Sequence, residues 1–498
     1  MSNLITLIVI ILYFAFVIYT RAMVSRKARQ NAEGFFLGSR NMGPIVTAMS
    51  AEASDMSAFL FMGLPGLAYI SGFSYIIWII LGLTIGLYLS FLLIAKRLRI
   101  YSKTLEAVTI PDFFSKRFAE KDDAIKNITT IIIVIFLVPY MAAAFSAIGK
   151  LLNTLFGFNY NIGVVIGSII IIIYTTVTGF GSMAVMDLIQ TNIITFALAV
   201  LVFFSIRKAG GWYQVKLNYE TPINGLNSNS IFSIISMLAW GIGYLGMPHI
   251  LVHFMAIRHE EELRISRRVA TIWAFIVMSI AGLTGVVAYT VSNVGYVPIL
   301  DDVDAEKLVF YITNLIKEQG LFFCIVAGLV LSGVIASVLT TADSQLLCAA
   351  SSVSESLAKS ILNKKIDNRK GLVIVRIIIV VMIIFALFFS LDPSNKIFSM
   401  VSFAWAGFGA CIGSVMLLAL FSKKVNAVGV KWGLIVSVIV VFIWKFIIRS
   451  INAFSNIYEL LPAFIIGILV SILMSKKSKV QNRKVTDIFD EVMAQVKE

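Results

Sequence analysis

The stretch from Ser50 to Gly66 reads SAEASDMSAFLFMGLPG and lies inside an apolar segment long enough to cross a lipid bilayer. It places two carboxylates, Glu52 and Asp55, where hydrocarbon would surround them. A carboxylate in the middle of a membrane helix costs at least about 2.5 kcal/mol on insertion scales, so we expect each to face a cavity, a partner or an ion. The small residues and the Leu-Pro-Gly sequence favour a broken helix, whose free carbonyls a membrane tolerates only where they line a cavity. The stretch therefore predicts a discontinuous helix like those that bind ions and substrates in secondary transporters.

The composition is that of a polytopic membrane protein. Of the 498 residues, 59% are hydrophobic and 14% are charged, and the mean hydropathy is +0.92. We attribute the net charge of +14 to Lys and Arg in cytoplasmic loops, so no nucleic-acid partner is expected. The three cysteines all lie in apolar runs and indicate neither a disulfide framework nor a metal site. No small-residue cleavage site follows the first apolar run, which we interpret as a retained span rather than a signal peptide.

Apolar runs predict about thirteen spans of roughly 20 residues each, and therefore an all-α fold in the cell membrane. They are 3–20, 44–70, 73–95, 126–148, 162–183, 188–206, 231–249, 270–292, 320–350, 372–391, 397–421, 428–447 and 458–475. If the basic loops are cytoplasmic, the N-terminus lies outside and the C-terminus inside. We expect short interfacial helices in 101–122, a passive extracellular loop rather than a lid in 293–318, and an amphipathic helix in the tail.

A second interrupted segment occurs five spans after the first. Residues 239–250 read AWGIGYLGMPHI, in which glycines and a proline again weaken the middle of a span. Helix-packing glycines explain either segment alone. Together, interruptions in corresponding positions predict an inverted repeat with a binding site between its halves. The predicted divisions are 1–43 (first helix and cytoplasmic loop), 44–206 (first repeat), 207–229 (extracellular loop), 230–421 (second repeat), 422–475 (two peripheral helices) and 476–498 (cytoplasmic tail).

Hydroxyl groups follow one face of the ninth span. They belong to Ser337, Thr340, Thr341 and Ser344, which recur at spacings of three and four. Hydroxyls on a membrane helix often bond back to their own helix, which is the alternative interpretation. The intramembrane Asp343 in the same stretch favours a site, because alkali cations select carbonyl, hydroxyl and carboxylate oxygens. We expect carbonyls released at Ala53 and Met56 to join the hydroxyls of Thr340 and Thr341 around a cation.

Aromatic side chains in the second interrupted segment are candidates for a substrate wall. Trp240 and Tyr244 share a helix face, and Pro248 lies one turn further on. Such pairs commonly serve membrane packing, but an aromatic wall also suits the apolar body of a small zwitterion. Tyr140 and Trp405 are weaker candidates of the same kind.

The remaining polar residues give no case for an enzyme. The three histidines have no carboxylate or cysteine at metal-ligand spacing, so we interpret them as structural. Asp187 is interpreted either as part of the cytoplasmic mouth of a cation path or as an ordinary carboxylate at a helix start. The sequence contains no evident phosphate-binding loop, nucleophile elbow or HExxH pattern.

Several runs together resemble the sodium:solute symporter family, most closely its sodium/proline branch. They are LGSRNMGP (37–44), ASDMS (53–57), MGLPG (62–66), WGIGYLGMPHIL (240–251), TADSQLL (341–347) and SFAWAGFGA (402–410). The match extends over essentially the whole chain at consistent spacing. The resemblance implies thirteen helices with the five-plus-five inverted repeat of the leucine-transporter type.

The resemblance also implies roles for individual residues. The implied sodium ligands are the carbonyls of Ala53, Met56 and Ser337 and the hydroxyls of Thr340 and Thr341. Asp55 and Ser57 are implied in sodium and substrate coupling, and Arg40 in cytoplasmic gating. The implied or candidate substrate contacts are Trp240, Tyr244, Pro248 and Tyr140. Some relatives have a second cation site, whose matching positions are Asp187, Thr340, Asp343 and Ser344.

Four residues depart from the proline carriers. Glu52, Ala58, Phe59 and Met247 stand where those carriers have Gly, Gly, Trp and Gln. Phe59 and Met247 leave the substrate open, and Glu52 beside the ion site could allow proton coupling or pH sensitivity. The expected function is sodium-coupled symport of a small zwitterionic amino acid, L-proline, by alternating access. The alternatives are a sodium symporter of pantothenate or another carboxylate, and a membrane sensor that binds solute without moving it. Sodium is the expected coupling ion, and no other cofactor is expected.

Overall fold

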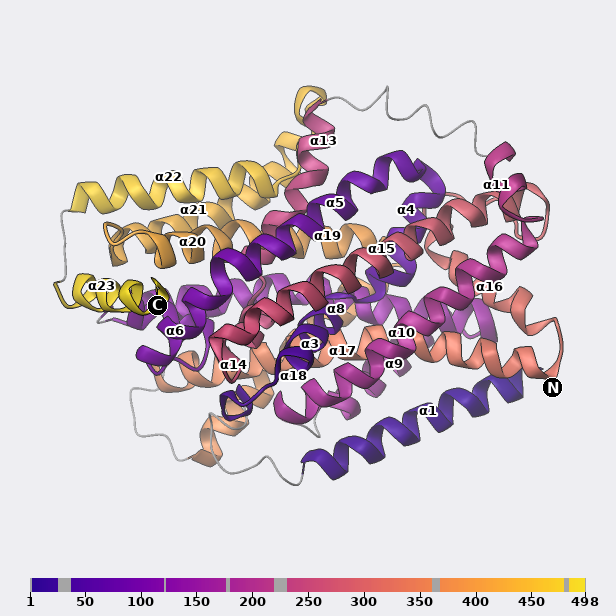
Figure 1. The fold of residues 1–498 in the computed structure, drawn as a ribbon, viewed down its shortest axis with the longest axis horizontal. Coiled ribbons are helices and arrows are strands. Elements are labelled where there is room, and N and C mark those ends of the chain that lie inside the picture. The colour runs from indigo at the N-terminus through magenta and orange to yellow at the C-terminus, as the bar shows by residue number, and fades with distance from the viewer. Residues whose placement is uncertain are drawn as a thin grey trace.

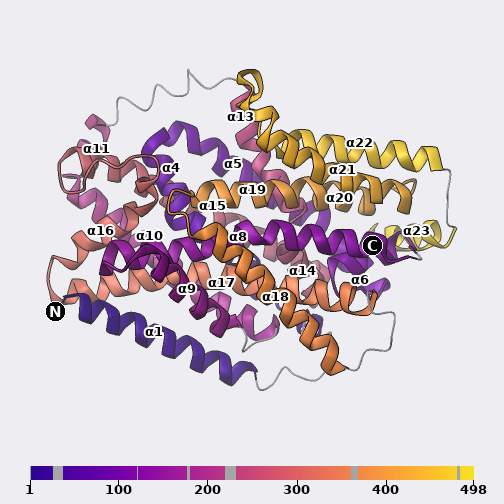
Figure 2. The same ribbon diagram turned by 180° about the vertical axis from the view of Figure 1, so that it is seen from behind.

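The computed structural model describes residues 2–25, 37–120, 122–175, 180–218, 231–360, 368–478 and 483–497. Within these ranges the fold is all-helical apart from an isolated bridge between Met42 and Ile257. The long helices run side by side along the molecule (Figures 1 and 2). One end carries α6 (Lys96–Thr104) and α23 (Arg483–Lys497), and the other carries α16 (Leu308–Lys317). We call these the α6 end and the α16 end.

The other helices have the following bounds. The first part of the chain forms α1 (Ser2–Ser25), α3 (Pro44–Asp55), α4 (Leu64–Ser71), α5 (Phe73–Leu89), α7 (Ile110–Arg117), α8 (Ala124–Phe156), α9 (Tyr160–Thr175), α10 (Phe180–Lys208) and α11 (Trp212–Asn218). The second part forms α13 (Ile231–Leu238), α14 (Pro248–Ala256), α15 (Leu263–Asn293), α17 (Leu321–Ser360), α18 (Asn368–Ser390), α19 (Ile397–Gly407), α20 (Ser414–Phe421), α21 (Ala427–Phe446) and α22 (Leu460–Ser478). Short turns that matter below are the 3-10 turns η1 (Gly38–Arg40), η4 (Ala239–Leu245) and η6 (Asp304–Lys307) and the π-helical turns η2 (Phe59–Gly63) and η3 (Ser90–Ala95).

In the described residues, nine helices are long and apolar enough to cross a membrane, or up to eleven if each of two bent pairs forms one span. The protein is therefore a multi-pass membrane protein. α1 lies along one edge of the bundle, and α21 and α22 lie along the opposite edge in both views (Figures 1 and 2). Some helices extend past the predicted spans: α5, η3 and α6 run on from Phe73 to Thr104. Helices α7 and α23 confirm the short helix expected in 101–122 and the helix expected in the tail.

One predicted span boundary is wrong. The sequence placed the fifth and sixth spans at 162–183 and 188–206, whereas α9 ends at Thr175 and α10 begins at Phe180. No charged residue occurs between Lys150 and Asp187, so charge does not mark this boundary. As a consequence, Asp187 lies inside α10 and is buried, with 1% of its surface exposed. It is therefore not a helix-start carboxylate.

The segment after α15 is not a simple surface loop, contrary to expectation, but contains η6 and α16 packed against the bundle. Its turn η6 packs on α4 so closely that a Cβ on Gly66 would lie 3.1 Å from the Ala305 backbone. Most of the apolar side chains of α16 are also buried. The region therefore forms a packed cap at the α16 end. In the other predicted extracellular loop, 207–229, residues 219–229 lie outside the described residues.

Helices α5 and η4 approach each other through glycines. A Cβ on Gly86 would lie 2.2 Å from the Cα of Gly241, and a Cβ on Gly241 would lie 2.1 Å from the Gly82 carbonyl oxygen. Small residues of this kind let membrane helices pack backbone against backbone. The contact holds the second interrupted segment against α5.

We expect Gly86→Ala to destabilise the protein by about 1–3 kcal/mol or more, because the added methyl group must push two backbones apart. The measurement is the thermal unfolding of purified protein in detergent. Gly43→Ala is the matched control, since a Cβ there has nothing within 4 Å. Equal unfolding temperatures for the two variants would show that the close approach is not needed.

Candidate functional site

The first interrupted segment breaks where the sequence predicted. Helix α3 ends at Asp55 and the chain resumes at Phe59 after a bend of 62°. At the bend, the N–H of Ser57 donates to the Asp55 carbonyl at 2.7 Å. In an uninterrupted helix this N–H would donate to the carbonyl of Ala53, four residues back. The bend therefore releases the Ala53 carbonyl from the helix.

The released carbonyl faces the hydroxyl row of α17. The hydroxyl oxygen of Thr340 lies 2.8 Å from the Ala53 oxygen and 3.1 Å from the Ser337 carbonyl, and that of Thr341 lies 3.4 Å from the Ala53 oxygen. All four residues are buried, as is Met56 at the bend. A hydroxyl donates one proton and keeps lone pairs for a cation. Carbonyls and hydroxyls in this arrangement are the oxygen ligands that alkali cations select.

Asp55 connects the two interrupted segments. Its Oδ2 accepts a hydrogen bond of 2.6 Å from the hydroxyl of Tyr244, and its carbonyl accepts one of 3.3 Å from Tyr140. Tyr244 belongs to η4, which lies at the break between α13 and α14, where the chain bends by 46°. The two breaks therefore meet at one carboxylate. Ser57 has a different contact, because its Oγ accepts the N–H of Phe59 at 3.2 Å.

A small aromatic cavity lies beside Asp55. Its volume of about 10 Å³ is room for roughly one water molecule. It is lined by Asp55, Met56, Phe59, Leu83, Tyr140, Trp240, Met278, Val401 and Trp405. The Trp240 ring stacks on Phe59 with 5.6 Å between centroids, and Trp405 Nε1 donates to the Trp240 carbonyl at 2.7 Å.

Two of the four predicted substrate residues, Trp240 and Tyr140, line the cavity, and the other two, Tyr244 and Pro248, do not. Trp240 and Tyr140 line the cavity directly, and Tyr244 reaches it through Asp55. Pro248 begins α14 and is buried, but neither it nor Met247 is part of the described lining. Of the two departures expected near the substrate, Phe59 lines this cavity and Met247 does not.

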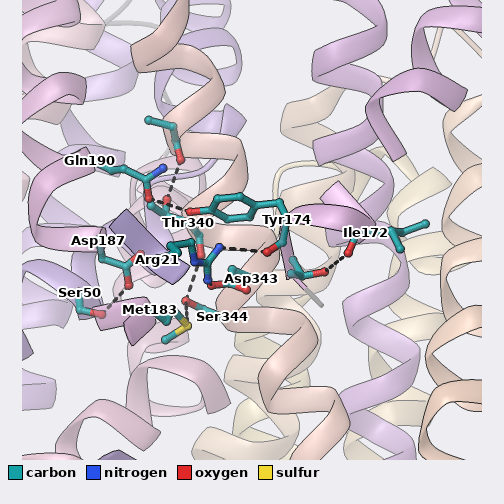
Figure 3. Close-up of polar contacts among 12 residues, drawn as sticks. Arg21, Ser50, Ile172, Tyr174, Met183, Asp187, Gln190, Thr340, Asp343 and Ser344 are labelled. Carbon is teal, nitrogen blue, oxygen red and sulfur yellow. Dashed lines mark hydrogen bonds and ion pairs between the residues drawn. The ribbon is translucent and has the colours of Figure 1, made fainter. Parts of the chain in front are cut away.

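A second polar cluster lies on the next turn of α17 (Figure 3). Asp343 forms a buried ion pair with Arg21 of α1. Ser344 donates to the Thr340 carbonyl at 3.0 Å and contacts Met183. The residues proposed for a second cation are thus close together, but an arginine also occupies the cluster.

Asp187 belongs to a buried chain of polar groups. Its Oδ2 accepts a hydrogen bond of 2.6 Å from the Ser50 hydroxyl, which lies 2.8 Å from His253 Nε2. His253 Nδ1 lies 2.7 Å from the His249 carbonyl. Sequence reasoning missed Ser50, His253 and Arg21. No local signal could have found Arg21, because basic residues commonly flank membrane spans.

Arg40 ties the α6 end together. From η1 its guanidinium donates to the Ala107 carbonyl at 2.7 Å, the Met255 carbonyl at 3.0 Å and the Ser102 hydroxyl at 3.1 Å. These contacts join the start of the first interrupted segment to the end of the second one. They hold both segments together at the α6 end.

A buried ion pair ties the α16 end together. Lys150 Nζ of α8 lies 2.5 Å from Glu306 Oε2 of η6, and the side-chain exposures are 0% and 4%. The same carboxylate accepts the backbone N–H groups of Ile397 and Phe398 at 3.0 and 2.9 Å. Glu306 thus caps the start of α19, whose Phe398 ring lies 5.3 Å from that of Trp240.

We expect Glu306→Ala to lower the free energy of unfolding by about 3–5 kcal/mol, because it leaves the Lys150 charge buried without this partner. The measurement is thermal unfolding of purified protein. Asp302→Ala is the control: its pair with Lys396 is exposed and should be worth at most about 1 kcal/mol. A loss at Glu306 no larger than that at Asp302 would contradict the structural role of the pair.

The chain is similar in sequence to known membrane transporters. The sequence model of the sodium:solute symporter family matches residues 35–437. The chain is 34% identical to a sodium/proline symporter of Staphylococcus aureus over 490 residues, covering 96% of this chain and 94% of the relative. It is also 34% identical to the osmoregulated proline transporter OpuE of Bacillus subtilis (strain 168), covering 91% of each.

Solved structures show the same fold at low sequence identity. A sodium-coupled sialic acid symporter in a substrate-bound outward-open state matches with a TM-score of 0.77 and 16% identity, covering 95% of this chain and 98% of that one. A nucleobase-cation-symport-1 family transporter in a closed conformation matches with a TM-score of 0.57 and 14% identity, covering 93% and 97%. The interrupted helices described above therefore belong to a fold that solved cation-coupled transporters share.

Proposed function

Because the chain belongs to the sodium:solute symporter family, we propose that it carries L-proline into the cell together with sodium, by alternating access. It is a multi-pass protein of the cell membrane. The observation that carries the proposal is the Ala53 carbonyl, released at the bend and faced by the hydroxyls of Thr340 and Thr341. The names of the relatives from Staphylococcus aureus and Bacillus subtilis support proline as the substrate.

Sodium is proposed to bind between α3 and α17. The ligands are the carbonyls of Ala53, Met56 and Ser337 and the hydroxyls of Thr340 and Thr341. The Thr340 hydroxyl then turns its proton toward its own helix carbonyl at Ala336, 3.1 Å away, and its lone pairs toward the ion. The ion fixes the bent segment against α17, and this holds Asp55 in place for the substrate.

Proline is proposed to bind at the aromatic cavity beside Asp55. The carboxylate of Asp55 offers a partner to the substrate ammonium group, and the Trp240 ring offers an apolar wall to its pyrrolidine ring. Tyr140 and Tyr244 orient Asp55 from two sides. Ser57 and Pro248 lie at the two breaks. We propose that the segments containing them move when the cavity opens.

The proposed architecture is thirteen membrane helices with repeats at 44–206 and 230–421, the N-terminus outside and the C-terminus in the cytoplasm. The two bent segments and the fold likeness to cation-coupled symporters support it. With this orientation, Arg40 lies at the cytoplasmic gate and Glu306 at the extracellular one. A membrane potential contributes about 2.3 kcal/mol per charge per 100 mV, which can sustain roughly a fiftyfold gradient of a neutral zwitterion.

Uptake by reconstituted proteoliposomes tests the proposal. Radiolabelled proline should accumulate above equilibrium with an inward sodium gradient, and should not do so with lithium alone or with a proton gradient alone. Because Phe59 departs from the proline carriers, pantothenate and other small carboxylates belong in the same panel. Sodium-driven uptake of one of these without proline uptake would change the substrate, and binding without accumulation would indicate a sensor.

A further inference from the structure

Helix α1 carries a positive charge into the interior of the bundle. Arg21 is 1% exposed, although α1 lies at the edge of the bundle and outside the proposed repeats. Its guanidinium donates to Asp343 and to the Tyr174 carbonyl, the latter at 3.3 Å, and its Cζ lies 3.9 Å above the Tyr174 ring. Figure 3 shows the guanidinium between α10 and α17, with Asp187 on one side and Asp343 on the other.

Further contacts fix α1 in this position. Gln190 of α10 donates to the hydroxyl of Tyr13 at 2.8 Å and accepts from that of Tyr174 at 3.2 Å. Thr6 donates to the Cys324 carbonyl of α17 at 3.3 Å, so the helix is also held near its other end. These contacts hold α1 against α10 and α17, and therefore fix the Arg21 guanidinium inside the cluster.

The groups around Arg21 are oxygen ligands. Asp343 and Ser344 follow Thr340 within one turn of α17, and Asp187 interacts electrostatically with Arg21 from α10. Carboxylate and hydroxyl oxygens buried in a membrane are the set that a hard cation selects. Among the described residues, the positive charge beside these oxygens is the guanidinium of Arg21, which is part of the protein.

We propose that Arg21 is a fixed counter-cation that takes the place of a second sodium ion beside Asp343. The inference rests on the proposed sodium symport. With Arg21 present, its guanidinium always balances the negative charge of Asp343. The transported sodium then binds only at Ala53 and Thr340. Without the guanidinium, Asp343 is a buried carboxylate facing other oxygens, which a membrane interior tolerates poorly unless a cation joins it. A second sodium ion then enters and is carried with the substrate.

The test is the number of sodium ions moved per proline, measured from reversal potentials in proteoliposomes. The wild-type protein should move one ion and Arg21→Gln should move two. Arg21→Lys keeps the positive charge and should move one. The double variant R21Q/D343N removes both charges and should also move one, which separates a new sodium site from a general effect of losing the ion pair.

A count of two in the wild-type protein overturns the inference even if no variant folds. A count of one in an active Arg21→Gln variant overturns it as well. Both results leave the proposed symport intact. The proposed symport fails separately, if sodium does not drive proline uptake by the wild-type protein at all.

Discussion

Replacing Thr340 with valine should raise the sodium concentration needed for half-maximal proline uptake by about ten- to one-hundredfold. The hydroxyl of Thr340 lies 2.8 Å from the Ala53 carbonyl and 3.1 Å from that of Ser337, so it joins the two sides of the proposed sodium site. Valine keeps the shape and removes one oxygen ligand. Leaving buried polar groups without this partner costs about 1–3 kcal/mol, and about 1.4 kcal/mol corresponds to a factor of ten.

The measurement is the sodium dependence of uptake in proteoliposomes at a fixed proline concentration. Thr284→Val is the matched control, because that buried hydroxyl donates to the Ile280 carbonyl of its own helix at 2.9 Å. It should leave the sodium dependence unchanged. If Thr340→Val were indistinguishable from this control, the hydroxyl row of α17 would not hold the coupling ion.

Replacing Asp55 with asparagine should reduce sodium-driven uptake by at least about one-hundredfold. The Asp55 carboxylate lines the aromatic cavity, and Tyr244 donates to it at 2.6 Å. The amide keeps the size but removes the negative charge proposed to meet the substrate ammonium group. Truncating one partner of a buried charge pair costs about 2–5 kcal/mol or more, which supports an effect of this size.

Initial rates of proline uptake and the amount of inserted protein should be measured together. Asp112→Asn is the control, because Asp112 is a buried carboxylate on α7 that pairs with Lys116 and Lys126. Normal insertion with lost uptake is expected for Asp55→Asn only. Wild-type uptake by Asp55→Asn would remove this carboxylate from the coupling site.

The features that follow from local sequence were predictable. The break after Asp55 follows from small residues and a Pro-Gly pair close along the chain, and the hydroxyl row follows from the helical period. The meeting of Ala53 with Thr340 joins positions 287 residues apart. It could be expected because both halves of the contact carry their own signal, an interrupted helix on one side and a polar stripe on the other.

Other features depend on partners that carry no local signal. Arg21 and Asp343 are 322 residues apart, and Arg21 looks in the sequence like one more basic residue flanking a span. The pair of Lys150 and Glu306 joins a charge within a long apolar helix to a residue from a loop that looks passive. The boundary before α10 was missed because no charged residue lies near it on either side. Each error therefore arose where packing, and not hydropathy, decides the structure.

The most direct test of the account is a structure determined with sodium and proline bound. The account predicts an ion in contact with the carbonyls of Ala53 and Ser337 and the hydroxyls of Thr340 and Thr341, with proline beside Asp55. An ion bound elsewhere, with Thr340 still donating to Ala53, would contradict it.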